Sequence, residues 1–525
     1  MTGSDAYDIA IIGMGPVGAA AANLAGTAGL RTLVLERGDM PYRQPRAIVF
    51  DAEIMRIFAS VGLAERIAEV TKPLGGSIYL GADLQPIRSF RAPLPADPLA
   101  WHSSNLFYQP QLEALLRAGL QRFAHVDVRT GHDVLAIEDG AIRMRGSDGD
   151  EAIAHARFIL ACDGASSTVR KSLGIPLDDI GFEERWLVID TLVDGPMRWP
   201  ESHGIPPEVR DGRYSLMVCD PARPATLIPG AGRHRRWEYM LLAGESDDRV
   251  LADGWLRGLI GDWIDPDDVE IVRAAVYRFR ALLAARWRAG NVFLLGDAAH
   301  QTPPFYGQGM CHGIRDAAQL MWRLALVLRG QADDALLDGY QPEREPHVRA
   351  IISASVAAGA AVCMTDPDEA ARRDEAFRAA ERGRSGTVAM ADIVPPIRAG
   401  LVDAASGGMR LPEFVVDTSD GRRHLDRLLG GRFALVTAQE AGLAIGDPRW
   451  PAIDGRICAT SNPALANWLG DRAADWALVR PDRYVFAIGR GQAALDAMVA
   501  ALFDQLHIQP DAAVAPPAAT ETAQP

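Results

Sequence analysis

Residues 7–36 read YDIAIIGMGPVGAAAANLAGTAGLRTLVLE, and this stretch decides the fold of the first part of the chain. The apolar run at 7–12 is typical of a buried parallel strand, 16–29 is an alanine-rich helix candidate, and 31–36 is a second apolar strand. The glycines of GMGPVG, residues 13–18, lie between the first strand and the helix. This order predicts a βαβ unit that binds a dinucleotide at the start of its helix.

Each glycine of this motif has its own physical role. Gly13 permits the tight turn, Gly15 lets the backbone approach a pyrophosphate, and Gly18 lets the helix pack close to the sheet. Free N–H groups at the start of the helix face the phosphates. Glu36 ends the second strand, where its carboxylate can accept hydrogen bonds from a ribose diol. The motif alone leaves NAD, FAD and a turn that binds nothing all open.

Two further segments, far along the chain, carry small and acidic residues directly after an apolar strand. The first is ACDGASSTVR at 161–170, which follows the apolar residues 158–160. The second is GDAAH at 296–300, which continues through Pro303 and Pro304 to GQG at 307–309. A long amphipathic helix is expected to begin near 310–313 and to reach Leu328.

With these three motifs in this order, residues 7–350 resemble the class A flavoprotein aromatic hydroxylases, which are FAD-dependent monooxygenases. In that family the second motif, here with Asp163, lies near the flavin pyrophosphate, and the acid of the third, here Asp297, binds the ribityl chain. The family pattern also has an arginine after the second strand, here Arg46, and a glutamine that opens a helix, here Gln109. Cys311 stands where asparagine is frequent, a change that a backbone contact would tolerate.

The resemblance also gives the third motif a role in flavin chemistry. A helix N-terminus carries a partial positive charge, and next to the flavin's pyrimidine edge it would stabilise the negative charge that appears on reduction. The residues expected to bind FAD are Gly13, Gly15, Pro16, Val17, Gly18, Glu36, Arg37, Arg46, Gln109, Asp163, Gly296, Asp297, Pro304, Gly307, Gly309, Met310 and Cys311.

Within the family, the chain is most similar to 3-(3-hydroxyphenyl)propionate hydroxylases and related phenol hydroxylases. The similarity lies in CDPARP at 219–224, RWEYM at 236–240, residues 307–326 and VRPDRY at 479–484. It implies that NADH or NADPH reduces FAD, O₂ adds to the reduced flavin, and a flavin hydroperoxide transfers one oxygen to a phenolic ring. This chemistry requires an electron-rich ring and a site that keeps water away.

The substrate is expected under an inserted sheet, facing the flavin and the Pro303–Pro304 loop. The catalytic residues are not assigned by the sequence, and each candidate can also be interpreted as an ordinary strand or turn residue. The candidates are Pro303, Pro304, Tyr214, Arg223, His234 and Tyr239.

The fold class expected is α/β, a Rossmann-like FAD-binding domain with an inserted, mostly antiparallel β-sheet, as in the p-hydroxybenzoate hydroxylase fold. We expect the FAD-binding domain at 1–180 and 280–350 and the substrate-binding sheet at 181–279. A helical segment at 351–399 and a thioredoxin-like domain at 400–505 follow. Residues 506–525, rich in Pro, Ala and Thr, are expected to be disordered. The thioredoxin-like domain has only Cys458 and no CxxC, so a structural or dimer-contact role is expected there.

Composition excludes several classes of function. The net charge of −14 over 525 residues argues against a nucleic-acid partner and against docking on anionic membranes. Five scattered cysteines suit a reducing cytoplasm, the expected location, and the eleven histidines show no metal-ligand spacing, so no metal is expected. The N-terminus lacks a signal-peptide layout and no segment is apolar enough to span a membrane. The expected partners are a small aromatic substrate and O₂, with a homodimer as the oligomer considered.

Two other functions stay open at this point. The same motifs occur in hydroxylases of polycyclic aromatic polyketides, and another flavin oxidoreductase of this fold would share the first two. The absence of a WxWxIP segment argues against a halogenase, and the absence of CxxxxC after the first helix argues against a disulfide reductase. A non-enzymatic FAD-binding module is disfavoured because it has no need of an intact third motif.

Overall fold

A computed structural model describes residues 6–39, 46–198, 210, 212–382, 393–438 and 442–508. The chain forms two compact units, the first made of residues 1–96, 101–317 and 347–394 and the second of 97–100, 318–346 and 395–525. Most of the expected FAD-binding segments and the inserted sheet share the first unit, whereas residues 97–100 and 318–346 of the expected FAD-binding domain belong to the second. Of the tail predicted to be disordered, only residues 506–508 lie inside the described ranges.

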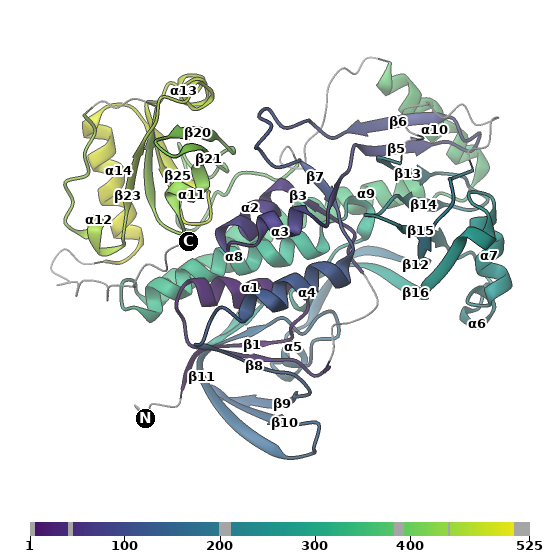
Figure 1. The fold of residues 1–525 in the computed structure, drawn as a ribbon, viewed down its shortest axis with the longest axis horizontal. Helices are drawn as coiled ribbons and strands as arrows, with labels where there is room; N and C mark the ends of the chain where they lie inside the picture. The colour runs from purple at the N-terminus through teal and green to yellow at the C-terminus, as the bar shows by residue number, and fades with distance from the viewer. Residues whose placement is uncertain are drawn as a thin grey trace. The chain divides into compact units, whose positions relative to one another are not determined.

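The predicted βαβ unit is present, with the first strand at its expected bounds and the helix and second strand slightly shorter than expected. β1 (Tyr7–Ile12) pairs in parallel with β2 (Thr32–Leu35), and α1 (Pro16–Thr27) connects them. Pro16 occupies the first turn of α1, where its missing N–H breaks no helical hydrogen bond. Both strands are largely buried because helices cover the sheet, and α4 (Gln109–Leu120) lies along α1 on one face (Figure 1).

The first sheet brings the ends of its parallel strands to one edge. Its strand order is β17-β18-β11-β1-β2-β8, and the antiparallel strands β9 and β10 extend it beside β11. Since β1, β2, β11 and β18 are parallel, the residues that follow them meet at the same edge. The strands not yet bounded are β8 (Val126–Arg129), β9 (Asp133–Glu138), β10 (Ala141–Arg145), β11 (Glu151–Ala161), β17 (Arg288–Ala289) and β18 (Val292–Leu294).

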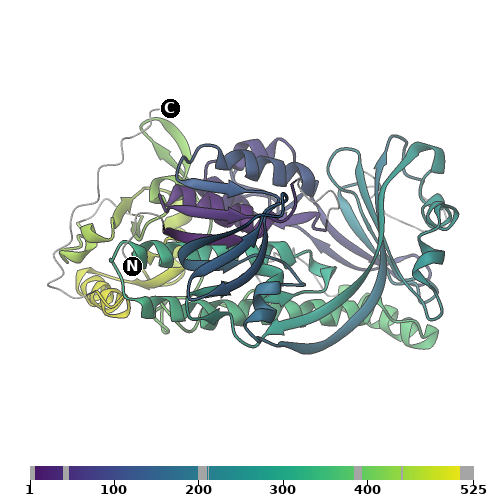
Figure 2. The same ribbon diagram turned by 90° about the horizontal axis from the view of Figure 1, so that it is seen from below.

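A second, mostly antiparallel sheet has the order β19-β16-β12-β15-β14-β13-β5-β6. The long strands β12 (Leu177–Val193) and β16 (Val269–Ala284) curve from the first sheet into the second (Figure 2). The segment predicted for this sheet, 181–279, supplies β13 (Tyr214–Val218), β14 (Ala225–Ile228), β15 (His234–Met240) and most of β12 and β16. The remaining strands come from elsewhere: β5 (Gly76–Leu80), β6 (Pro86–Arg91) and β19 (His300–Gln301).

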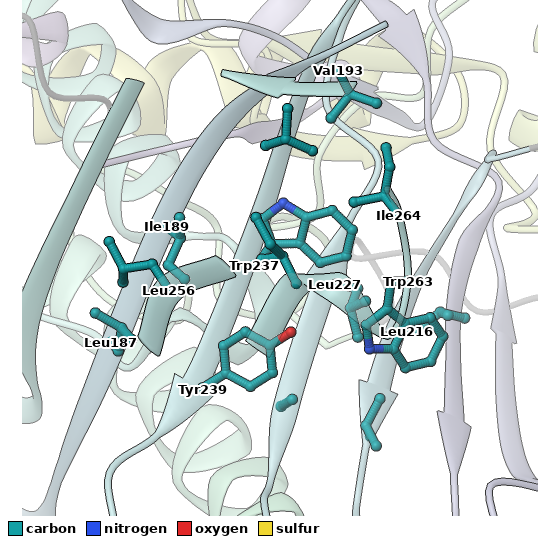
Figure 3. Packing of buried hydrophobic residues seen from close by; sticks show 14 of the residues in the cluster. Leu187, Ile189, Val193, Leu216, Leu227, Trp237, Tyr239, Leu256, Trp263 and Ile264 are labelled. Atoms are coloured by element: carbon teal, nitrogen blue, oxygen red, sulfur yellow. The ribbon is translucent and has the colours of Figure 1, made fainter. Parts of the chain in front are cut away.

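One face of the second sheet is a hydrophobic core. Alternate residues of β12, β13, β14 and β15, such as Leu187, Leu216, Leu227, Trp237 and Tyr239, point to this core face (Figure 3). They pack against residues of the following chain, which holds α6 (Asp247–Val250) and α7 (Asp253–Gly261). Because side chains alternate along a strand, the residues between them point to the opposite face.

Further helices and short strands belong wholly or partly to the first unit. The bounds are β3 (Val49–Asp51), β4 (Lys72–Pro73) and β7 (Ser104–Leu106), which form a small sheet, and α2 (Ala52–Ser60), α3 (Ala64–Ala68), α5 (Thr168–Ser172), α8 (Gly309–Leu328), α9 (Tyr340–Val362) and α10 (Pro367–Glu381). The segment predicted as helical at 351–399 is helical only through residue 381 among its described residues, and the irregular backbone at 395–398 contains Pro395 and Pro396. No described helix is by itself long and apolar enough to cross a membrane, although the bent pair Asp334–Val362 and Pro367–Glu381 passes when taken together.

The second unit contains a thioredoxin-like sheet. Its order is β23-β22-β24-β25, with β22 (Ala434–Thr437) parallel to β23 (Arg456–Ala459) and antiparallel to β24 (Trp476–Val479), which pairs with β25 (Val485–Gly489). The helix α14 (Gln492–Gln505) packs with Leu435 and Leu478, and α13 (Pro463–Gly470) packs with Val436 and Ala477. Neighbouring strand residues face opposite ways, so the two helices cover opposite faces.

A buried ion network stabilises this second unit. Glu343 accepts hydrogen bonds from Arg480 (2.8 Å), Gln319 (2.6 Å) and the backbone N–H of Leu401 (2.8 Å), and it also pairs with Arg323. Arg480 bonds Asp482 as well, and both ends of the Glu343–Arg480 pair are fully buried. A buried charge of this kind depends on its partner, because no water is available to solvate the charge if the partner is removed.

We predict that Arg480→Met destabilises the protein by about 3–5 kcal/mol, because it leaves Glu343 and Asp482 with less compensation in a buried site. Urea unfolding followed by circular dichroism measures this loss. Arg472→Met is the matched control, since Arg472 is exposed and should change stability little. Equal unfolding midpoints for the two variants would contradict the assignment of Arg480 as a stabilising partner.

Candidate active site

The three motifs line one cavity of about 940 Å³ in the first unit. The strand ends described above bring them there, and the cavity extends to the second sheet. Gly18, Gly296 and Cys311, also expected to bind FAD, do not line it and lie buried behind its wall. The other expected FAD-binding residues all line it: Gly13, Gly15, Pro16, Val17, Glu36, Arg37, Arg46, Gln109, Asp163, Asp297, Pro304, Gly307, Gly309 and Met310.

The glycine turn has the geometry that its spacing predicts. Gly13 has φ of +95°, and a Cβ there would lie 2.5 Å from the carbonyl oxygen of Cys162. A Cβ at Gly18 would lie 1.9 Å from the carbonyl oxygen of Gly13, so the helix can approach the turn only without a side chain. A Cβ at Gly15 would meet no atom within 4 Å. Gly15 caps α1 without a side-chain hydrogen bond, so free N–H groups there face open space.

Glu36 holds the turn from the end of β2. Its carboxylate accepts hydrogen bonds from the backbone N–H of Met14 (2.7 Å) and of Gly38 (3.0 Å). Arg117 on α4 donates to the carbonyl oxygen of Met14 at 3.1 Å. The carboxylate is thus fixed at the cavity wall, about where a ribose diol would reach it.

Gln109 positions the loop that carries Arg46. Its side-chain oxygen accepts hydrogen bonds from the backbone N–H groups of Arg46 (2.6 Å) and Ala47 (2.8 Å), while its amide donates to Glu113 at 2.7 Å. The guanidinium of Arg46 lies 3.9 Å from the carboxylate of Asp297. Gln109 and Arg46, the two positions suggested by the family resemblance, are therefore hydrogen-bonded to each other, and Arg46 lies beside Asp297 of the third motif.

The second motif places a carboxylate at the cavity wall. Asp163 accepts a hydrogen bond from the N–H of Val169 at 3.1 Å through Oδ2, and its Oδ1 is buried with no hydrogen-bond partner among the described residues. Such an oxygen is costly unless a ligand or water satisfies it. Arg170 donates to the carbonyl oxygen of Ala298 at 3.1 Å, which ties the second motif to the third.

Asp316 of α8 anchors the third motif. Its carboxylate accepts hydrogen bonds from the N–H of Gly296 (3.0 Å) and from His300 Nε2 (2.7 Å), and Asp316 and His300 are fully buried. Sequence reasoning missed Asp316; the signal available was that it is the only acidic residue of the helix at Gly309–Leu328. The neighbouring Asp297 lines the cavity, and its side chain is 40% exposed there. The surrounding protein still removes part of its hydration, which raises its pKa, although Arg46 and His300 oppose this shift.

The loop before α8 forms an apolar wall. Pro304 and Phe305 line the cavity, and Phe305 packs edge-on against Trp186, Phe279 and Phe182. Pro303 does not line the cavity, so the structure does not bring this candidate to the site. Cys311 is fully buried, with its sulfur 3.8 Å from the carbonyl oxygen of Gly307 and 3.9 Å from that of Val49, so it packs in the wall.

Four substrate-binding candidates on the second sheet require correction, because none of them is among the described residues that line the cavity. Tyr239 points to the core face, where its hydroxyl donates to the carbonyl oxygen of Leu259 at 2.8 Å (Figure 3). Tyr214 packs against the same core. Arg223 is paired with Glu245 at 2.6 Å, and His234 is buried against Asp190 at 2.8 Å.

The opposite face of the sheet lines the cavity instead, and we call it the cavity face. The alternation along these strands does not show which set of residues faces inward, and a shift by one residue reverses every side chain. The residues of the cavity face are Ser77, Tyr79, Val188, Ser215, Met217, Thr226, Ile228, Arg236, Glu238, Tyr277 and Phe279.

A buried charge cluster supports this face. Asp190 accepts hydrogen bonds from Arg236 (2.9 and 3.2 Å), Arg273 (3.4 Å) and His234 (2.8 Å). Burial alone would raise the pKa of Asp190, but Arg236 and His234 outweigh it and hold the pKa below its usual value. Arg236 also donates to the carbonyl oxygen of Arg46 at 2.5 Å, which joins the second sheet to the loop at the first.

These features fit FAD. A helix N-terminus and an open glycine suit a pyrophosphate, Glu36 suits a ribose, and the carboxylates of Asp163 and Asp297 face a cavity that continues to a second, partly aromatic region. The residues that line the cavity therefore have the geometry and the chemical groups that FAD binding requires.

Comparison with known proteins gives the family. The sequence model of the family described as "FAD binding domain" matches residues 6–355. A protein of Rhodococcus jostii (strain RHA1) named "Probable NADH-specific resorcinol 4-hydroxylase" is 32% identical over 515 residues, covering 94% of each chain. A "3-(3-hydroxy-phenyl)propionate/3-hydroxycinnamic acid hydroxylase" of Mycobacterium sp. (strain KMS) is also 32% identical, covering 95% of this chain and 91% of the relative.

Solved structures agree on the fold. The flavin-dependent monooxygenase PieE, in complex with FAD and substrate, matches with a TM-score of 0.77 at 20% identity, covering 96% of this chain and 100% of that one. Aklavinone-11 hydroxylase with FAD and aklavinone matches with a TM-score of 0.75 at 22% identity, with the same coverage. Together with the family match and the relatives, this likeness gives the conclusion that the chain belongs to the FAD-binding family of flavin-dependent aromatic hydroxylases and is an oxidoreductase with FAD as its cofactor.

Proposed function

We propose that the protein hydroxylates a small phenolic compound, with NADH as the electron donor and O₂ as the source of the oxygen atom. The observation that carries this proposal is the single cavity in which the three FAD motifs meet the cavity face of the second sheet. The names of two relatives, one a resorcinol hydroxylase described as NADH-specific and one a hydroxylase of hydroxyphenyl acids, support a single-ring phenol.

The residues of the first sheet edge would hold the cofactor. In this proposal the turn at 13–18 and the N-terminus of α1 receive the pyrophosphate, Glu36 binds a ribose, and Asp297 binds the ribityl hydroxyls. The N-terminus of α8, preceded by Gly307 in a left-handed conformation, stabilises negative charge at the flavin's pyrimidine edge. When bound, FAD supplies the redox chemistry by accepting two electrons and enabling the transfer of one oxygen atom from O₂.

The other side of the cavity would hold the substrate ring. Tyr79, Met217, Phe279 and Phe305 offer apolar and aromatic surface, and residues such as Ser215 and Thr226 offer hydroxyl groups. A largely apolar chamber keeps water from the reacting atoms, which this type of oxygen transfer requires. We propose a small phenol as the substrate. A polycyclic polyketide is the alternative, because a structure of similar fold was solved with aklavinone bound.

The first test measures substrate-dependent NADH oxidation and product formation by the FAD-loaded enzyme. We expect phenol, resorcinol or 3-(3-hydroxyphenyl)propionate to stimulate NADH oxidation and to yield a product that carries one additional oxygen from ¹⁸O₂. Ring compounds without a hydroxyl are the matched controls. Product from a polycyclic aromatic polyketide alone would contradict the single-ring assignment, and oxidation without any oxygenated product would contradict the hydroxylase function.

We predict that Gly15→Val abolishes FAD binding, because its side chain would occupy the open space at the N-terminus of α1. The backbone of Gly15 is extended (φ −69°), so valine itself is tolerated there without strain. The flavin content of the purified protein, read from its visible absorbance, checks this. Gly254→Val is the control, since its Cβ also meets no atom within 4 Å but lies outside the cavity. A full flavin complement in Gly15→Val would disprove the pyrophosphate site.

We predict a smaller loss for Asp297→Ala, which removes one acceptor but adds no obstruction. A hydrogen bond to a charged group contributes about 1.5–3 kcal/mol, so FAD affinity should fall about tenfold to a hundredfold. Titration of the apoprotein with FAD gives the dissociation constants. An unchanged constant would show that this carboxylate does not contact the cofactor.

Phe305→Ala is predicted to uncouple the reaction. The substitution opens the apolar wall by a side chain whose burial contributes about 1.5–3 kcal/mol, and water gains access to the chamber. The variant should retain FAD and oxidise NADH, yet release more hydrogen peroxide and less hydroxylated product per NADH. Phe414→Ala, a core change in the second unit, is the control. A peroxide yield equal to that of the wild type would show that Phe305 does not protect the chamber.

A further inference from the structure

Glu238 is a carboxylic acid at the centre of the cavity face. It lies on β15 between Thr226 of β14 and Val188 of β12, which the strand register places directly beside it. Met217 and Tyr79 continue the same row across β13 and β5. All five residues line the cavity, and Glu238 is only 6% exposed. A substrate ring on this face therefore has one carboxylic acid in the middle of an otherwise uncharged row.

The fold does not use the carboxylate of Glu238. No described residue donates a hydrogen bond to it, and its closest cation is Arg236, whose Nη1 is 4.0 Å from Oε1. Arg236 bonds instead to Asp190 and to the backbone of the Arg46 loop. Asp190 shows what a structural carboxylate in this sheet looks like, with three cationic or imidazole partners. Glu238 is buried, lacks such partners and opens on the cavity.

Its surroundings make both protonation states accessible near neutrality. Burial raises the pKa of Glu238 to about 7, Arg236 partly opposes the shift, and the negative charge of Asp190 adds to it. The other ionisable groups on this sheet include Glu184 of β12, Arg273 and Tyr277 of β16, Tyr79 of β5 and His234 of β15. Burial lowers the pKa of His234 and raises that of Tyr79, so neither replaces Glu238 as a group that titrates near pH 7.

We propose that Glu238 binds the ring hydroxyl of the substrate and takes its proton during oxygen transfer. This inference rests on the proposed phenol hydroxylase function and assigns the base within it. A carboxylate that accepts no hydrogen bond from the described residues can accept the hydroxyl's hydrogen bond. A base whose pKa lies near the working pH is suited to proton transfer.

The proton balance of the step is closed. The O–H bond of the phenol breaks, its proton passes to a carboxylate oxygen of Glu238, and the electron pair stays on the ring oxygen. This pair enriches the ortho and para carbons, one of which takes an oxygen atom derived from O₂ at the expense of two electrons from NADH; the second oxygen atom leaves as water. The oxygenated carbon loses its hydrogen as a proton, and the ring oxygen recovers a proton from Glu238. The proton from carbon, the hydrogen delivered by NADH and one proton from solvent supply the new hydroxyl group and the water.

The same assignment fixes which end of the substrate meets the sheet. A carboxylate group at this position would face Glu238 as a second anion, so a substrate that bears an acid must direct it away from the cavity face. A neutral dihydroxybenzene meets no such restriction. The hydroxyl beside Glu238 thus determines the ring carbons that are activated.

The test compares Glu238→Gln, Glu238→Asp and the control Glu270→Gln, an exposed residue of the same sheet. In the wild type and in Glu270→Gln, kcat/KM for a phenol should fall as pH falls below about 7, because Glu238 becomes protonated. Glu238→Gln should keep its FAD, lose this pH dependence and lose about a hundredfold or more in hydroxylation. Glu238→Asp should retain the pH dependence at a reduced rate.

A polyfluorinated phenol that keeps a hydrogen at an ortho or para carbon ionises without help at the assay pH, so it distinguishes a base from a residue that only shapes the cavity. The ratio of wild-type to Glu238→Gln rates should shrink for this substrate relative to the parent phenol. A ratio that is the same for both phenols, or a Glu238→Gln enzyme with the wild-type rate and pH profile, overturns the assignment. Failure of the wild type itself to hydroxylate any phenol would instead overturn the proposed function on which the assignment depends.

Discussion

The parallel pairing of β1, β2, β11 and β18 is the constraint on which the site depends. Parallel strands finish at a common edge, so segments separated by almost the whole length of the first unit are forced to meet there. The glycine turn, Glu36, Asp163 and the GDAAH segment each follow one of these strands. Asp316 and Arg170 then fix the third motif to α8 and to the second motif, which leaves the loops little freedom to separate.

The second sheet is joined to this edge by charge. Arg236 donates hydrogen bonds to Asp190 inside the sheet and to the backbone of Arg46 outside it. One guanidinium therefore connects the second sheet to the loop that Gln109 holds. A buried ion pair contributes little to net stability once the loss of hydration is considered, but it defines geometry because its partners cannot be exchanged. Glu238, two residues along the same strand, lies 4.0 Å from Arg236 and accepts no hydrogen bond from the described residues.

Much of this was predictable from the sequence, and the limits have physical causes. The βαβ unit and the three motifs have strong local patterns, such as the apolar strand before Gly13 and the apolar residues before Gly296, whereas the thioredoxin-like unit was expected from the family resemblance. The residues of the second sheet that line the cavity have no such pattern. Alternation in RWEYM marks a strand, but Trp237 and Tyr239 were as plausible on the inside as Arg236 and Glu238. The roles of Tyr79 and Asp316 depend on partners more than a hundred residues away or on buried contacts, which leave no local pattern.

The pairing of β5 with β13 has a consequence for how the protein is made. Residues 76–80 lie beside residues 214–218 in the finished sheet, so more than a hundred residues must be synthesised after β5 before its partner exists. Until then the β5–β6 hairpin has an unpaired edge, the kind of surface that invites association with other chains. Contacts of such long sequence separation also slow folding, because the intervening chain must be closed into a loop first. The nucleotide-binding edge has a similar requirement, because β11 pairs with β18 about as far away along the chain, so neither side of the cavity is complete until the segment after β18 has been synthesised.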